Sequence, residues 1–424
     1  MKSILIGCMC LIIAFSTSAQ MVDDTVSINA GYTNQTWYSL ASGTLQSNAK
    51  TEWDLAFEIS GITSSIRTNS VNGNKLYVYP SGDTGSWNNI DTTGIGSWSE
   101  SLNSDTSWAW GAFNVNTNVS DPNDLGWGVY NITTHHVTGD SIYIINHGGD
   151  FKKLWMVSLA SGTYTFRIAD LDGSSEIERT LAKGDFPDKN FGYYSIDTDQ
   201  NLNREPIAYN WDLLFTQYPA LIPGFGSYPS TGVLLNRGVQ AAQVYPVDDA
   251  ETYEDYSSAS FSTEMNSIGY RWKSYNFGTN GWDIADSTVY FIKDYNANVW
   301  KVVMRDFGGS TDGNYMFSKE MVGSAPVDTT DTTTGINVVE TETFINIYPN
   351  PTTNQAVTVV YDLGNADGAE MTISNLNGSI IDKRMLIGSG LRTESINLGG
   401  ISSGIYLVNV RNAHSSTVEK LIVR

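Results

Sequence analysis

A cluster of tryptophans marks the segment from Pro80 to about Gly126, which is otherwise rich in Gly, Ser, Thr and Asn. Its members are Trp87, Trp98, Trp108, Trp110 and Trp127. Indole rings exposed on a polar loop commonly stack on sugars or on another flat ligand. Trp98, Trp108 and Trp110 are therefore candidate stacking residues, and packing of the loop around its own rings is the alternative.

Motifs of the common enzyme classes are absent from the sequence. There is no Gly-rich phosphate loop after a strand, no Gly-x-Ser-x-Gly and no His-Glu-x-x-His. The acidic stretches Asp170–Gly173 and Asp248–Glu251 do not continue as calcium loops, so solvated turns are favoured over cation sites. We expect a protein that is not an enzyme and that has no metal site.

Charge and composition narrow the class further. The 424 residues carry a net charge of −21, which disfavours nucleic acid and anionic membranes as partners. Trp, Tyr, Gly, Thr and Asn are abundant and long helical patterns are missing, which predicts an all-β protein. Strands such as 163–168 alternate apolar and polar residues, as half-buried antiparallel strands do.

The first 19 residues read as a secretory signal. Lys2 precedes an apolar run from Ile4 to Phe15, and small residues precede a cleavage site before Gln20. Both cysteines, Cys8 and Cys10, lie inside this segment. The mature chain therefore has no disulfide and no cysteine nucleophile.

The sequence contains an internal duplication. Tyr38-Ser39-Leu40 followed by Trp53–Phe57 is matched by Tyr194-Ser195-Ile196 followed by Trp211–Phe215. Later landmarks recur in the same order. The repetition predicts two copies of one antiparallel β-rich domain, over residues 20–180 and 185–323. Within each signature, alternation puts Trp53, Leu55 and Phe57 on one core face, while Asp54 caps a turn or pairs locally.

A different organisation follows the second copy. Residues 324–340 are rich in Thr and Asp and predict a solvated linker, either a plain spacer or an acceptor for O-glycans. Residues 341–424 contain six short β-rich runs separated by turns, which predict an Ig-like β-sandwich. The motifs here are Ile347–Pro351, Ile373–Gly378, Gly404-Ile405-Tyr406 and Lys420–Arg424. This region resembles the type A C-terminal sorting domain of the type IX secretion system of Bacteroidetes. The resemblance implies export across the outer membrane by that machinery, followed by release or surface attachment.

The duplicated region resembles the HmuY family of secreted or surface proteins of Bacteroidetes. The motifs that carry this resemblance in the first copy are Trp53–Phe57, Arg67–Ser70, the Lys153-x-x-Met156 strand and Tyr164-x-Phe166; those in the second copy are Trp211–Phe215, Asn236–Gly238, Lys301–Met304 and Tyr315–Phe317. The resemblance implies haem as the ligand, held by two axial His or Met side chains and passed to an outer-membrane receptor.

Histidines limit where haem could bind. The four are His135, His136, His147 and His414, and the second copy has none. If turns lie at 138–139 and 148–149, His136 and Met156 flank Ser141 about 10 Å apart, a possible His/Met slot. His135 and His147 are the other axial candidates, and exposed hairpin histidines with Met156 in the core are the alternative.

These observations predict a secreted, non-enzymatic binding protein exported by the type IX system. Capture of haem or another tetrapyrrole is the first candidate function. A surface adhesin or glycan-binding module that uses the loop tryptophans is the alternative. No cofactor other than haem is expected.

Overall fold

The computed structural model divides the chain into two compact units, residues 1–327 and 328–424. It describes residues 21–323 except 62 and 223–225, and residues 344–424 except 349, 351, 353–355, 364–367, 376–379, 388–391 and 412–415. The predicted signal segment 1–19, the linker 324–340 and His414 lie outside the described residues. The described residues form strands and short 3-10 turns, which confirms the all-β prediction. None of their helices is long or apolar enough to span a bilayer.

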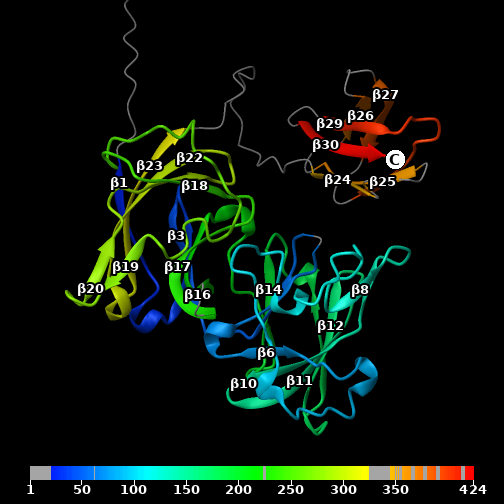
Figure 1. Cartoon of the computed structure of the whole chain (residues 1–424), viewed down its shortest axis with the longest axis horizontal. Helices are drawn as coiled ribbons and strands as arrows, with labels where there is room; N and C mark the ends of the chain where they lie inside the picture. Colours follow the sequence, from blue (N-terminus) through cyan, green and yellow to red (C-terminus); the bar gives the residue numbers. More distant parts are fainter. Residues whose placement is uncertain are drawn as a thin grey trace, which may run out of the picture. The chain divides into compact units, whose positions relative to one another are not determined.

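The first unit contains two β-rich lobes (Figure 1). The first lobe runs from β4 to β15, residues 55–202, around one core that includes Phe57, Phe166 and Tyr194. Its large sheet has the order β13 (Ile177–Ala182), β12 (Thr163–Asp170), β11 (Asp150–Ala160), β10 (Ile142–His147), β6 (Lys75–Val78), β7 (Glu100–Ser101), with the hairpin β8 (Gly128–Asn131) and β9 (His136–Gly139) beside β11. Its small sheet has the order β15 (Gln200–Leu202), β14 (Phe191–Ser195), β4 (Leu55–Glu58), β5 (Ile66–Thr68).

The second lobe combines both ends of this unit, residues 22–49 and 213–323, around a core that includes Tyr38, Phe215 and Phe317. Its larger sheet has the order β1 (Val22–Ser27), β23 (Asn314–Gly323), β22 (Val299–Phe307), β21 (Val289–Lys293), β18 (Gln240–Val244). Its smaller sheets are β17 (Gly226–Leu235), β16 (Leu213–Ile222), β2 (Asn34–Ser39), β3 (Gly43–Ala49), and the hairpin β19 (Lys273–Asn276) and β20 (Gly281–Ile284).

The two lobes share one strand order. The series β15-β14-β4-β5 corresponds strand for strand to β3-β2-β16-β17, and β13-β12-β11-β10-β6 corresponds to β1-β23-β22-β21-β18. The segments headed by Trp53 and Trp211 therefore occupy equivalent places. Each lobe, however, takes its strands from both sequence copies.

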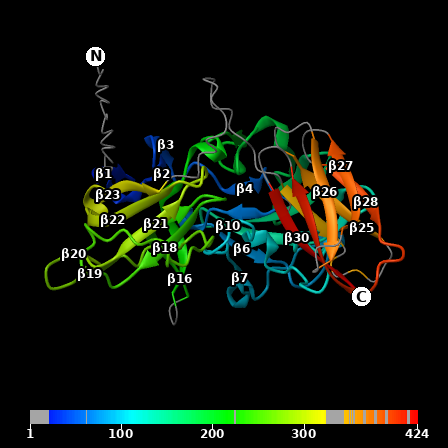
Figure 2. The same ribbon diagram turned by 90° about the horizontal axis from the view of Figure 1, so that it is seen from above.

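Strands are exchanged between the copies. β2, which carries Tyr38, pairs with β16 of the second copy, and β14, which carries Tyr194, pairs with β4 of the first. Figures 1 and 2 show the blue N-terminal strands beside the yellow strands β22 and β23. The compact bodies thus differ from the predicted ranges 20–180 and 185–323, because β1–β3 belong to the sheets of the second range, and β14 and β15 belong to a sheet of the first.

The two aspartates of the Trp-Asp-Leu signature hold the exchanged strands. Asp54 Oδ2 accepts a hydrogen bond from Ile196 N at 2.7 Å, and Asp212 Oδ2 accepts one from Leu40 N at 2.7 Å. Both carboxylates are structural, but their partners are far along the chain and not local as predicted. Trp53 does not share a face with Leu55 and Phe57 as predicted. It packs with Ala56 in a separate cluster, whereas Leu55 and Phe57 lie in the main core of the first lobe.

The second unit consists of two sheets on one core, as expected of a β-sandwich. The sheets are β24 (Phe344–Tyr348), β25 (Ala356–Asp362), β28 (Arg392–Asn397), and β27 (Ile380–Ile387), β26 (Gly368–Asn375), β29 (Gly404–Arg411), β30 (Ser416–Val423). β27 was not among the predicted runs. It is an edge strand with charged Asp382, Lys383 and Arg384 at its centre, which hides the apolar alternation.

Candidate functional site

A cavity lies between the two lobes of the first unit. It leaves about 70 Å³ in which the centre of a water molecule can lie, which is room for several waters or one small polar molecule. Aromatic rings from both lobes contribute to its wall: Trp37, Trp53, Trp108, Phe191, Tyr193, Trp211 and Tyr218. Phe191 and Tyr193 lie on β14, Trp37 on β2 and Tyr218 on β16. Trp53 and Trp211 lie two residues before β4 and β16, and Trp108 lies on a loop of the first lobe.

A loop of the first lobe, residues 103–110, reaches across the cavity to the second lobe. We call it the clasp. The Thr106 carbonyl accepts from Met265 N at 2.9 Å, and Asp105 Oδ2 accepts from Leu221 N at 3.0 Å. Trp108 Nε1 donates to the Leu235 carbonyl at 2.7 Å. These three bonds close one side of the cavity.

Arg67 on β5 fixes the shape of the clasp. Its guanidinium donates to the carbonyls of Ser104 at 2.8 Å and Ser107 at 3.0 Å, and it lies 5.1 Å from the centre of the Trp108 ring. Burial lowers the pKa of Arg67 to about 10, so the group stays charged at neutral pH. The guanidinium of Arg67 is thus already hydrogen-bonded to backbone carbonyls.

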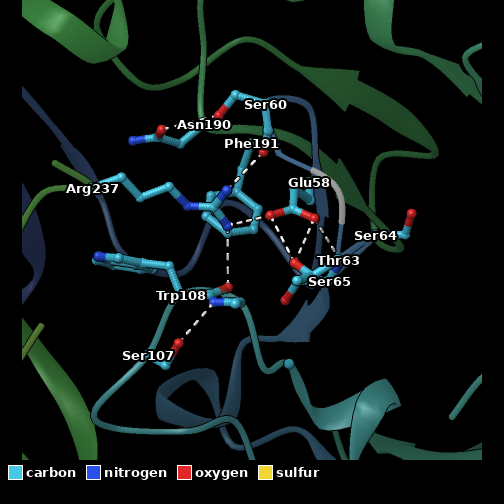
Figure 3. A network of polar contacts seen from close by, with 12 residues as sticks. Glu58, Ser60, Thr63, Ser64, Ser65, Ser107, Trp108, Asn190, Phe191 and Arg237 are labelled. Carbon is cyan, nitrogen blue, oxygen red and sulfur yellow. Dashed lines mark hydrogen bonds and ion pairs between the residues drawn. The ribbon is translucent and has the colours of Figure 1, made fainter. Parts of the chain in front are cut away.

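An ion pair joins the lobes beside the clasp (Figure 3). Arg237 of the second lobe lies 2.5 Å from the Glu58 carboxylate, which is almost fully buried. Glu58 also accepts from Ser65 N at 3.0 Å, and Arg237 donates to the Ser60 carbonyl at 2.7 Å and to the Trp108 carbonyl at 3.3 Å. Both charges therefore have close partners in the low-dielectric interface.

Glu205 lies in the cavity wall and is fully buried. Its carboxylate accepts from Asn190 N at 2.5 Å, from Phe191 N at 2.8 Å and from the Tyr193 hydroxyl at 2.8 Å. Burial raises the pKa of Glu205 to about 7 in spite of these donors.

The raised pKa of Glu205 predicts a pH dependence of stability. The folded protein binds the proton more tightly than the unfolded chain, whose carboxyl titrates near 4.5, so stability is lost as pH rises from about 4.5 through 7. Glu205→Gln removes this loss. We expect the free energy of unfolding of the variant minus that of the natural chain to grow by about 3 kcal/mol across this window. Urea denaturation at a series of pH values measures the difference, and a constant difference would contradict the assignment.

Several buried polar atoms at the cavity have no hydrogen-bond partner. They belong to five lining residues: Thr68 Oγ1, Asn69 Oδ1, Ser70 Oγ, Trp211 Nε1 and Tyr218 Oη. Buried polar groups in folded proteins nearly always have partners, supplied by protein, water or ligand. All five residues line the cavity, so a polar molecule bound there is a candidate partner for these atoms.

The pseudo-symmetry of the lobes sharpens this observation. Asn69 and Asn236 each donate from Nδ2 to the backbone carbonyl of a signature tryptophan, Trp53 and Trp211 respectively. Asn236 Oδ1 then accepts from Asn190 Nδ2 at 2.7 Å, whereas Asn69 Oδ1 lacks a partner. Likewise Trp53 Nε1 donates to Gln35 Oε1 at 3.3 Å, whereas Trp211 Nε1 has no acceptor. At each equivalent pair the protein satisfies one member and leaves the other at the cavity.

The structure separates the three predicted stacking tryptophans. Trp108 lines the cavity and is half-buried between the lobes, in contact with Phe191 at 5.9 Å between ring centres. Trp98 packs edge-on against Tyr79 at 6.0 Å. Trp110 is 45% exposed on the outer side of the clasp. Only Trp108 is therefore placed with other candidate binding groups.

The predicted His136–Met156 slot is not formed. Met156 is 1% exposed and packs in the first-lobe core. The turn at 148–149 is present, but residues 138–139 belong to β9, which pairs with β11 through Thr138 and Ser158, so the assumed second turn was wrong.

The remaining axial candidates have other partners. His135 bonds the Tyr130 hydroxyl through Nδ1 at 2.6 Å. His147 Nε2 lies 3.2 Å from Asp197 Oδ1 and 3.7 Å from Asp54 Oδ1. Among the described residues, no group of three or more His, Cys, Asp or Glu is placed to hold a metal ion.

Sequence reasoning missed Trp211 and Tyr218 as site residues and treated Thr68, Asn69 and Ser70 only as part of a family resemblance. The Arg-Thr-Asn-Ser motif was visible in the sequence. Its role was hidden because the cavity depends on how two lobes meet, and no single strand pattern encodes that.

Comparison with known proteins identifies the C-terminal segment. Residues 346–424 match the family described as "Secretion system C-terminal sorting domain". This segment is the sorting domain of a type IX secretion substrate, and the protein is exported to the cell surface or the extracellular space.

The other comparisons add little. No curated protein matches the chain. A solved structure described as "Biofilm associated protein - BSP domain" aligns with 10% identity and a TM-score of 0.17, covering 99% of this chain and 84% of that one. A likeness at that level carries no argument about fold or function. The HmuY-like expectation for residues 20–323 has no counterpart among these matches.

Proposed function

We propose that the body of this protein, residues 21–323, is a non-enzymatic binding module that takes a small neutral saccharide between its lobes. The observation that carries the proposal is the set of unpartnered buried polar atoms on the cavity wall. Type IX export presents this module outside the cell, where sugars of surface polymers are available to it.

The state of the charged groups favours a neutral ligand. Arg67 is bonded to carbonyls and Glu205 to three donors, so neither charge is left for a charged ligand. The atoms without partners are hydroxyl, amide and indole groups, which match neutral hydroxyls. An anionic ligand would also approach a chain of net charge −21 against repulsion.

The aromatic wall favours a sugar among neutral polar molecules. A pyranose has hydroxyls on its rim and an apolar C–H face, and indole rings pack against such faces. Trp108 and Trp53 provide rings beside Asn69 and Thr68. This arrangement supports the glycan-binding alternative, with Trp108 as the one loop tryptophan involved.

Haem capture is the weaker proposal. It requires Met156 to leave a close-packed core or His147 to turn away from two carboxylates. Titration with haemin distinguishes the two: a sharpened Soret band that is lost in His136→Ala would overturn the saccharide proposal if no sugar binds.

The direct test is calorimetric titration with a panel of neutral mono- and oligosaccharides. Tyr218→Phe removes only an unpartnered hydroxyl, so it should leave stability unchanged or raise it, yet weaken binding roughly threefold to tenfold. Tyr315→Phe is the matched control, because the Tyr315 hydroxyl is also buried but Tyr315 does not line the cavity. If the two variants bind equally, or no sugar of the panel binds, the proposal fails.

A further inference from the structure

The outer face of the sorting domain's larger sheet carries an apolar patch. Ile380 on β27 is 60% exposed, and Ile405 and Leu407 on β29 are 44% and 36% exposed. Ile422 on β30 is directly opposite Ile405. We call these four residues the outer patch.

The patch is unusual for its place in the fold. The exposed face of an antiparallel sheet is normally polar, and contiguous apolar surface on a soluble domain commonly marks an interaction site. Leu407 is opposite Ser374 on one side and Lys420 on the other, and Ser374 is opposite Ile380. Ile405, Leu407 and Ile422 therefore form one group across β29 and β30, and Ile380 lies beyond Ser374 on the same face.

Packing in the sandwich core accounts for only some residues of the sorting motifs. In the motifs at 404–406 and 420–424, Tyr406, Leu421 and Val423 face the sandwich core. Ile405 and Ile422 alternate with them and point outward. Stability of the sandwich does not account for isoleucine at these two positions.

Cations border the patch. Lys420 is exposed beside Leu407, and Arg411 is exposed farther along β29. The only acidic residue that these registers place on the same face is Glu370, which pairs with Lys383 at 2.6 Å and lies opposite Arg411. The apolar residues of the described outer face thus have Lys420 as their neighbouring charge.

We propose that the outer patch and Lys420 form the surface that docks on a component of the type IX machinery, and that this component presents apolar side chains bordered by carboxylates. A domain whose family role is sorting must be read by that machinery. Among its described residues, this face combines exposed apolar groups with a charge that could orient a partner. The inference is independent of the saccharide proposal.

The test is export of the full-length chain in a bacterium that has a type IX system. Ile405→Thr and Leu407→Thr put a residue of high strand propensity at each position but remove the apolar surface. Each should lower the amount outside the cell at least fivefold, with accumulation in the periplasm and an unchanged melting temperature. Lys420→Glu, which keeps the patch and reverses the charge, should lower export as well.

Met385→Thr is the matched control. Met385 is 64% exposed on β27 and lies opposite Glu370, four residues along β26 from Ser374. Its export should remain normal. Unchanged export of the patch variants would overturn the proposal. So would loss of self-association in sedimentation with normal export, because the patch would then join two copies of this chain.

Discussion

A fragment of residues 51–205 is expected to fold when expressed alone, whereas a fragment of residues 20–180 of nearly the same length is expected not to fold. The first contains every strand of the first lobe, β4 to β15, and its complete core. The second lacks β14, the neighbour of β4 within the small sheet, and it keeps β1 and β2 without their partners β23 and β16. Loss of buried aromatics such as Phe191 and Tyr194 costs about 3–5 kcal/mol each, against a total stability of about 5–15 kcal/mol.

Circular dichroism with urea denaturation checks this expectation. Residues 51–205 should unfold cooperatively, although Trp53 and Tyr193 become exposed where the second lobe is missing. Residues 20–180 should show no cooperative transition. A cooperative transition of the 20–180 fragment would mean that each copy closes on itself and that the exchange of strands is not required.

Replacing Arg237 by Met is expected to destabilise the first unit by about 3 kcal/mol or more, because Glu58 is then buried without a cation. The double variant Glu58→Gln with Arg237→Met should recover a large part of this loss. Chemical denaturation of the three chains gives the coupling between the two side chains directly.

A surface ion pair provides the comparison. Arg179 and Asp199 pair across the first lobe, but both side chains are more than a third exposed. Arg179→Met should therefore cost at most about 1 kcal/mol. If Arg237→Met costs no more than Arg179→Met, the ion pair between the lobes does not hold them together.

Local sequence patterns predicted the strands but not their partners. Alternation along 163–168 and the repeated Trp-Asp signatures indicate antiparallel strands, and β12, β4 and β16 are found there. The Tyr-Ser strand of one copy, however, resembles that of the other, and each pairs its Tyr with the Leu of a Trp-Asp-Leu signature, Tyr38 with Leu213 and Tyr194 with Leu55. Chain geometry between the lobes makes the choice, and it leaves no signal in residue types.

For the same reason, the candidate site was predicted only in part. Trp108 was recognised as a ring on a polar loop, and it does line the cavity. Its bond to Leu235 joins residues 127 positions apart, which no local pattern reveals. Met156 shows the opposite error: its alternating apolar neighbours already favoured the core, and the structure places it there.

The exchange also sets the order in which the molecule can be completed. The strand around Tyr38 is synthesised before the first lobe, and its partner β16 follows only after that lobe is complete. At a synthesis rate of about 5–20 residues per second, roughly ten seconds or longer pass between the synthesis of this strand and that of β16. Until their partner strands are made, β1–β3 have unpaired edges that can associate with other chains. The lobe that contains both ends of the body is therefore the last to fold.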